Sequence, residues 1–132
     1  MMKKPLLALF LAASALSAAP QAVAQPMDAQ QSFEGRQHDL VTLAGHLGTL
    51  HRLQQVCGGG YDTNRYRNRI QQVIRAEEPM GATRLDMIAA FNSAYRNSSR
   101  QFLACDAITQ DLQVEEARKA LRIVDRLYAP FR

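Results

Sequence analysis

The two cysteines carry the most sharply defined chemistry in this sequence. Cys57 and Cys105 are the only cysteines, and they lie far apart in the chain. A redox-active pair normally has C-x-x-C spacing, and a zinc site needs further Cys or His residues at ligand spacing. Neither pattern is present. In an oxidising compartment such a pair forms a structural disulfide, which would stabilise the fold by about 4 kcal/mol in the chain-entropy model.

The histidines do not have the spacing of a metal site. His38, His46 and His51 are eight and five residues apart. Two ligands on one helix are three or four residues apart, so that both rings share a face. We therefore expect no metal. We expect His51, about two turns before Cys57, to be partly buried near the disulfide.

Catalytic motifs are absent from the sequence. No G-x-S-x-G or S-x-x-K pattern occurs. The adjacent acids Glu77-Glu78 and Glu115-Glu116 do not face each other on a helix, so each pair indicates solvated surface or a turn. We expect a protein without enzymatic activity or a cofactor; an uncharacterised hydrolase is the alternative, and it would need an acid and a hydroxyl to converge on His51.

Two polar clusters are candidate binding surfaces. The first lies between Tyr61 and Arg69, where arginines alternate with tyrosines as stacking and phosphate binding require. The second lies between Asn92 and Arg100, where Asn and Ser are unusually frequent for a helix interior. The alternatives are a solvated arginine face with a core tyrosine, and an ordinary polar helix face. With His51, the candidate binding residues are Arg65, Tyr66, Arg69, Asn92, Tyr95, Arg96 and Arg100.

The first 24 residues have the three-part layout of a signal peptide. Lys3 and Lys4 precede an apolar run over 5–16, and Ala22-Val23-Ala24 supplies small residues before the expected cleavage site. The run is shorter than the roughly 20 apolar residues that a membrane-spanning helix needs. We expect a periplasmic protein that starts at Gln25, with no stable membrane insertion.

The exported part is small and nearly neutral. Without the first 24 of the 132 residues, 108 remain, enough for one domain. The net charge of +4 then falls to +2, because Lys3 and Lys4 are removed. A nucleic-acid partner is not expected, since it would favour a strongly basic face.

Apolar periodicity predicts an all-α domain over 37–132, after a disordered leader over 25–36. The first helix carries a leucine stripe and ends at Gly58-Gly59-Gly60. A second helix begins with a cap at Asp62 or Thr63 and ends at Pro79. The third opens with Thr83 and Asp86 as a capping box, and the fourth covers about 109–128. The core stripes expected on the four helices are Leu40, Leu43, Leu47 and Leu50; Tyr66, Ile70, Val73 and Ile74; Leu85, Ile88, Phe91, Tyr95 and Phe102; and Val114, Ala117, Leu121, Val124 and Tyr128.

The cysteines predict how these helices are arranged. Each is expected on the core-facing stripe at the carboxyl end of a helix, the first and the third. A bond between them makes those helices parallel, and short connections then make the second and fourth antiparallel to them. The expected fold is a small up-down-up-down four-helix bundle with one disulfide.

Three features together resemble a known family. They are the signal peptide, the leucine-rich helix ending at Cys57, and the segment from Phe91-Asn92-x-x-Tyr95-Arg96 to Cys105. This combination resembles an uncharacterised family of small exported alphaproteobacterial proteins with two well-separated cysteines. The resemblance implies a disulfide and a periplasmic location, and no catalytic residue, because the family's function is unassigned.

We therefore expect a non-catalytic interaction module. Its partner would be a cell-envelope protein or peptidoglycan, and its role would be in wall growth or envelope integrity. The alternative is a carrier that holds a small ligand or lipid in the bundle interior. No oligomeric state is predicted.

Overall fold

Helix α1 runs through the middle of the molecule, and every other helix packs against it. The computed structural model describes residues 26–131, with side chains from residue 29. The elements are α1 (Pro26–Cys57), α2 (Arg65–Glu77), α3 (Gly81–Gln101), α4 (Ala107–Tyr128) and a short 3-10 turn, η1 (Ala129–Phe131). The predicted signal peptide lies outside the described residues.

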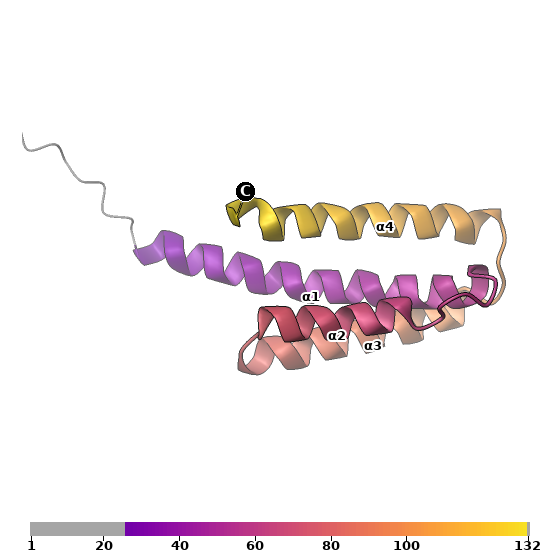
Figure 1. The fold of residues 1–132 in the computed structure, drawn as a ribbon, viewed down its shortest axis with the longest axis horizontal. Helices are drawn as coiled ribbons and strands as arrows, with labels where there is room; N and C mark the ends of the chain where they lie inside the picture. Colours follow the sequence, from indigo (N-terminus) through magenta and orange to yellow (C-terminus); the bar gives the residue numbers. More distant parts are fainter. Residues whose placement is uncertain (1–25, 132) are drawn as a thin grey trace, which may run out of the picture.

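Successive helices run in opposite directions (Figure 1), so α1 and α3 are parallel and α2 and α4 are antiparallel to them. A disulfide joins Cys57 to Cys105. The predicted all-α, up-down-up-down four-helix arrangement is confirmed. Cys105 differs in one respect from expectation: it lies after the end of α3, in the connection to α4, and is exposed.

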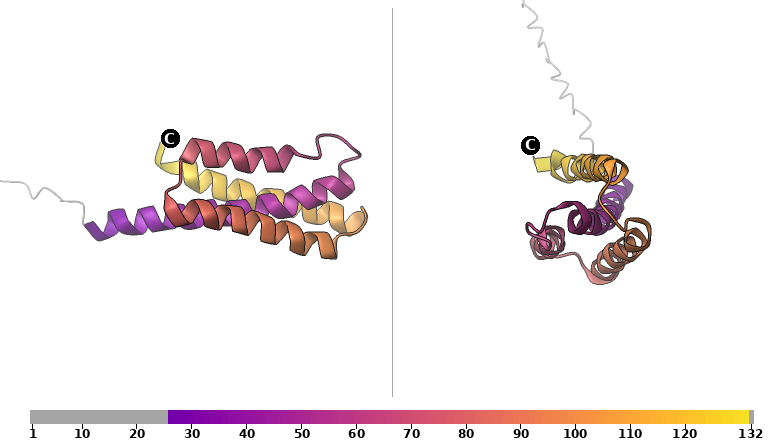
Figure 2. Two further views of the ribbon diagram at one scale, coloured as in Figure 1. Left: turned by 90° about the horizontal axis from the view of Figure 1, so that it is seen from below. Right: turned by 90° about the vertical axis from the view of Figure 1, so that its right-hand side faces the viewer.

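The helices surround α1 instead of forming a closed ring. Seen end-on in Figure 2, α4 lies on one side of α1, and α2 and α3 lie on the other. Each of these three helices contacts α1 along its length, whereas within residues 26–131 they have little contact with one another. Helix α1 is therefore the only element that every other helix shares.

The core is built on the leucine stripe of α1. Leu40, Leu43, Leu47 and Leu50 are all buried, as predicted, and Leu53 extends the stripe by one turn. Burying a leucine side chain contributes about 1.5–3 kcal/mol, so this stripe supplies much of the driving force for folding. The residues that the other helices bury in the same cluster are Ile70, Met87, Phe91, Ala120, Ile123 and Leu127.

The start of α1 differs from the expected disordered leader. The helix is continuous from Pro26 and crosses the expected domain boundary at residue 37 without a break. Proline suits the first turn of a helix, and Gln30 donates a hydrogen bond to Glu34 one turn later, at 2.8 Å. Residues 29–35 are exposed. This segment therefore has no apolar face, which is why its sequence shows no periodicity.

The helix starts also differ in their capping residues. Asn64 is the N-cap of α2, in place of Asp62 or Thr63. Helix α3 begins at Gly81 without a side-chain cap, so Thr83 lies inside the helix and the predicted capping box there is wrong. A capping box is present at α4, where Asp106 and Thr109 bind each other's backbone amides.

Helix α3 packs on α1 through a face that differs from the predicted one. Its buried side chains are Met87, Phe91 and Ser98, whereas Leu85 is 67% exposed. Leu85 precedes Met87 by two residues, about 200° around the helix, so the predicted face, which contained Leu85 and Ile88, is wrong in that part. The two backbones approach closely at Gly48 of α1, where a Cβ atom would lie 2.2 Å from the carbonyl oxygen of Phe91.

Helix α4 is also rotated relative to expectation. It buries Ala120, Ile123 and Leu127, each one position before a residue of the predicted stripe. Leu121 and Tyr128, from that stripe, are exposed. Ala117 and Val124 of the predicted stripe are partly buried against the core. Helix α4 therefore has two adjacent apolar stripes, of which one is buried and the other is only partly covered.

Polar contacts fix α1 at two levels. About three turns into the helix, Arg36 donates hydrogen bonds to Glu77 of α2 (2.6 Å) and to the Leu127 carbonyl of α4 (2.7 Å). Near its end, Arg52 donates two to the Phe102 carbonyl, at 3.0 and 2.8 Å. These carbonyls lie at helix C-termini, where backbone oxygens lack partners within the helix.

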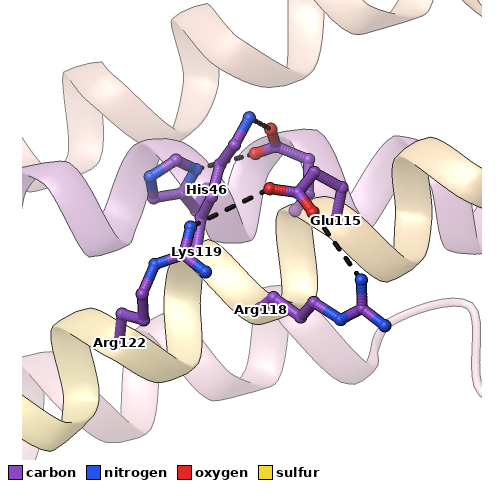
Figure 3. Close-up of polar contacts among 6 residues, drawn as sticks. His46, Glu115, Arg118, Lys119 and Arg122 are labelled. Atoms are coloured by element: carbon purple, nitrogen blue, oxygen red, sulfur yellow. Dashed lines mark hydrogen bonds and ion pairs between the residues drawn. The ribbon is translucent and has the colours of Figure 1, made fainter.

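Midway along α1, His46 contacts Glu116 of α4 at 2.7 Å, and Lys119 donates to the same carboxylate at 2.8 Å (Figure 3). Burial alone would raise the pKa of Glu116, but the hydrogen bonds from Lys119 and His46 bring this pKa below its ordinary value. Glu116 and Glu77 both bridge to α1, so the expectation that these acids are only solvated is wrong for one member of each pair.

The disulfide should make a large contribution to stability. Cys57 and Cys105 are separated by 48 positions in sequence. Closing a loop of this length stabilises the folded state by about 4 kcal/mol in the chain-entropy model. We expect Cys57→Ser/Cys105→Ser to lower the thermal midpoint by on the order of 15 °C, measured by circular dichroism. A midpoint unchanged by the double substitution would contradict this role.

The close approach of α1 and α3 can be tested with two glycines of the same helix. We expect Gly48→Ala to destabilise the protein by about 1–3 kcal/mol, because the added methyl group meets the Phe91 carbonyl. Gly45→Ala is the control: a Cβ atom there has no neighbour within 4 Å, so it should stabilise the helix by up to about 1 kcal/mol. Equal effects of the two substitutions in denaturant unfolding would contradict the packing described.

Candidate functional site

Two grooves flank α2, one on each side. The groove between α2 and α4 has a volume of about 490 Å³. Its floor is the leucine stripe of α1, including Leu43, Leu47 and Leu50. The walls are Tyr66 and Val73 from α2, and Leu121, Val124 and Tyr128 from α4. The groove is therefore largely apolar.

The second apolar stripe of α4 forms one wall of this groove from Ala117 to Tyr128, with Leu121 and Tyr128 exposed and Ala117 and Val124 partly buried. Val114, Ala117, Leu121, Val124 and Tyr128 recur at alternating intervals of three and four residues. This repeat is typical of a helix that packs against another helix through a continuous seam. Among the described residues α2 and α4 have little direct contact, so Leu121 and Tyr128 of this stripe are left exposed. We call the space between these two helices the α2–α4 groove.

The second groove lies between α2 and α3 and has a different character. Its volume is about 460 Å³, and Ile70 and Phe91 form its apolar floor. Three arginines surround it: Arg67, Arg75 and Arg84. The amides of Gln71 and Asn92 also line it. We call this space the α2–α3 groove.

The structure distributes the predicted binding residues over several places. Tyr66 and Arg69 line the α2–α4 groove, and Asn92 lines the α2–α3 groove. Arg65 is exposed at the start of α2, and Arg96 and Arg100 are exposed on α3. Arg100 donates a hydrogen bond to Asn97 of the same helix. The predicted residues therefore do not form one site.

His51 and Tyr95 lie together in the interior. The ring of His51 is 4% exposed and stacks at a tilt on Phe91 and Tyr95, with centroid distances of 5.7 and 5.1 Å. The Tyr95 hydroxyl donates to Gln55 of α1 at 3.0 Å. Because His51 is buried, it is unavailable to a partner at the surface, and its role is in the packing of α1 against α3.

The environment of His51 favours the neutral ring. Its Nδ1 atom is buried without a hydrogen-bond partner. Burial lowers the pKa of His51 below its ordinary value, and the positive charge of Arg67 lowers this pKa further. A protonated His51 is therefore disfavoured in the folded protein.

Neither groove presents the residues of a metal centre. Among the residues that the structure describes, no three His, Cys, Asp or Glu side chains are placed to hold a metal ion. None of the described helices is both long and apolar enough to cross a membrane. The α2–α4 groove is largely apolar and the α2–α3 groove is lined by arginines, so the two grooves are suited to binding apolar and anionic partners, respectively.

Sequence patterns alone missed most of the residues that line the grooves. Arg75 belongs to the arginine-rich second helix, but Arg84 is isolated in sequence, and no pattern indicates that the two face one groove. Leu121 was predicted as a core residue and is exposed. Helix α4 has more apolar positions than its packing on α1 alone requires. This excess is the sequence signal that indicates a partly uncovered apolar surface.

The buried His51 should make stability depend on pH. Its pKa in the folded protein is below the ordinary value of 6.5. As the pH falls below about 6.5, the unfolded chain binds a proton that the folded protein does not, so the free energy of unfolding decreases. We expect the thermal midpoint to fall between about pH 7 and 5, and His51→Phe to remove part of this decrease. His38→Gln, at an exposed position of the same helix, should retain it; a slope unaffected by His51→Phe would contradict the assignment.

Comparison with known proteins places this fold in a family. The family model described as "Protein of unknown function (DUF2385)" matches residues 36–131, a span that contains both cysteines and both grooves. No curated protein and no solved structure matches the chain. Membership in an uncharacterised family is thus confirmed, whereas alphaproteobacterial origin and export stay predictions. This chain belongs to DUF2385, a family of unknown function.

Proposed function

We propose that this protein is a non-catalytic interaction module of the cell envelope and that its α2–α4 groove binds an apolar helical segment of an envelope protein. The partly uncovered apolar stripe of α4 is the observation that carries the proposal. Export to the periplasm, with cleavage before Gln25, is part of the proposal and rests on the sequence of residues 1–24. The role served would be wall growth or envelope integrity.

A helix is the occupant that fits the groove best. The alternating intervals of three and four residues on α4 match the knobs-into-holes packing of a second helix. A partner helix would also cover the leucines of α1 on the groove floor. Arg69 lines the α2 side and offers a positive charge to the polar flank of an amphipathic helix.

Peptidoglycan is a less suitable occupant of this groove. Its sugars and peptides present many hydrogen-bonding groups, which lose free energy when they are buried without partners. The described wall and floor are mainly leucine, valine and alanine side chains. A protein partner with an apolar face avoids this loss.

The alternative function, a carrier of a small ligand or lipid, is favoured by the volume of the same groove. About 490 Å³ lies within the usual range of ligand pockets, roughly 300–1,000 Å³. The space would be the open α2–α4 groove and not the bundle interior, where Leu40, Leu50, Leu53 and Met87 are fully buried. Mass spectrometry of organic extracts would reveal a co-purifying lipid and separate the two functions.

The proposal can be tested by crosslinking in intact cells. Leu121→Glu places a charge in the groove at a position that is 61% exposed, so it should abolish partner capture with little change in the thermal midpoint. Leu85→Glu is the matched control, since Leu85 is similarly exposed on α3 and does not line the groove. We expect capture to survive Leu85→Glu, and the captured chain to start at Gln25. Capture that is unaffected by Leu121→Glu, or a full-length chain, would contradict the proposal.

A further inference from the structure

Positive charge is concentrated on one side of the molecule. Residues 65–101, which form α2, α3 and their connection, contain seven arginines and three carboxylates. Helix α4 contains four basic and four acidic residues. The α2–α3 hairpin lies on the opposite side of α1 from α4 (Figure 2). The nearly neutral net charge of the domain therefore hides a basic face.

The arginines of this face lack ionic partners. On α4, Arg118 and Arg122 contact Glu115, and Arg126 contacts Asp39. On α1, Arg36 and Arg52 bind Glu77 and a helix C-terminus. By contrast, the described structure gives no hydrogen bond or ion pair to the three arginines of the α2–α3 groove, Arg67, Arg75 and Arg84. Unpaired guanidinium groups around one groove are available to an anionic ligand.

The positions of these arginines suit a surface that carries several phosphate groups. Arg67 and Arg75 are eight residues apart on α2, which corresponds to about 12 Å along the helix. Arg84 lies near the start of α3, on the other side of the groove. Guanidinium groups bind phosphate through paired hydrogen bonds. Neighbouring headgroups of a lipid surface present phosphates at several points, which matches arginines on both sides of the groove.

Exposed apolar side chains accompany the arginines. Met80, in the turn before α3, is 81% exposed, and Leu85 follows Arg84 directly. Ile88, one turn after Leu85, is exposed and lines the α2–α3 groove. Arginines together with exposed apolar side chains on one hairpin are typical of proteins that lie in the interface of an anionic membrane.

We propose that the α2–α3 hairpin docks on an anionic phospholipid surface, with Arg67, Arg75 and Arg84 binding lipid phosphates and Met80, Leu85 and Ile88 inserting between headgroups. Glu78 and Asp86 are the exposed carboxylates of this hairpin and reduce the attraction, but the arginines outnumber them. The α2–α4 groove stays open in this orientation because α4 lies on the other side of α1. Membrane docking and partner binding are therefore independent properties.

Vesicle flotation of the purified protein tests whether the arginines bind an anionic membrane surface. We expect binding to phosphatidylcholine vesicles that contain phosphatidylglycerol, little binding to phosphatidylcholine alone, and loss of binding at high salt. Each arginine near an anionic surface contributes roughly a fivefold gain in affinity, so Arg75→Gln/Arg84→Gln should weaken binding about 25-fold. Arg118→Gln/Arg122→Gln is the control, because it removes the same charge from α4 and should change affinity less than about threefold.

Tryptophan fluorescence tests the insertion. The chain contains no tryptophan, so the fluorescence of a single introduced tryptophan reports the polarity around that position alone. We expect a blue shift for Leu85→Trp, and none for Leu121→Trp, when phosphatidylglycerol vesicles are added. Leu121→Glu should bind vesicles as the unsubstituted protein does, which separates this inference from the proposed partner groove. Equal loss of vesicle binding in the two arginine double variants would overturn the proposal. So would inhibition of vesicle binding by inorganic phosphate at the same concentration as the lipid phosphate, or the absence of a fluorescence shift for Leu85→Trp.

Discussion

The burial of α1 on three sides is the constraint on which the rest of this structure depends. Helices α2, α3 and α4 each pack against α1 and have little contact with one another among the described residues. Every other helix therefore takes its position from side chains of α1: the leucine stripe, the glycine that admits α3, and two arginines, Arg36 and Arg52. A change that moves α1 would move all three neighbours.

Features that depend on one regular pattern were predictable from the sequence. The leucine stripe of α1 has a period that only a helix explains, and its end at three glycines leaves no alternative. The disulfide then determined the direction of α3 relative to α1, so the topology followed from two cysteines. These inferences succeeded because each depends on local geometry and a covalent bond, not on the details of side-chain packing.

The faces of α3 and α4 were not predictable in the same way. On α3, Ser98 is buried while Leu85 is exposed, because the helix packs through the face that contains Met87 and Phe91, and Leu85 lies on another face. On α4, two apolar stripes lie side by side, and hydrophobicity alone cannot show which one packs on α1. Of the candidate site, only Tyr66, Arg69 and Asn92 line grooves; the other lining residues come together only when helices distant in sequence are placed beside each other.

The difference between the two grooves follows from the helical geometry of α2. This helix buries only Ile70 fully, so its two flanks face different neighbours instead of a common core. Tyr66 and Val73, seven residues apart, lie on the flank toward α4. Arg67 and Arg75, eight residues apart, lie on the flank toward α3. A single helix thus gives one groove a wall of mixed apolar and charged residues and the other a wall that carries two arginines.

This open arrangement explains why so small a domain needs its covalent and polar connections. Apolar side chains that would complete a closed bundle, such as Leu121 and Leu85, are left exposed, so they contribute less to folding than buried ones. Small domains already bury a lower fraction of their surface than large ones. The disulfide at the end of α1, and the contacts of Arg36 with the last turns of α2 and α4, offset part of this loss. Because both lie at the ends of the helices, they hold the bundle together while leaving the grooves along its sides uncovered.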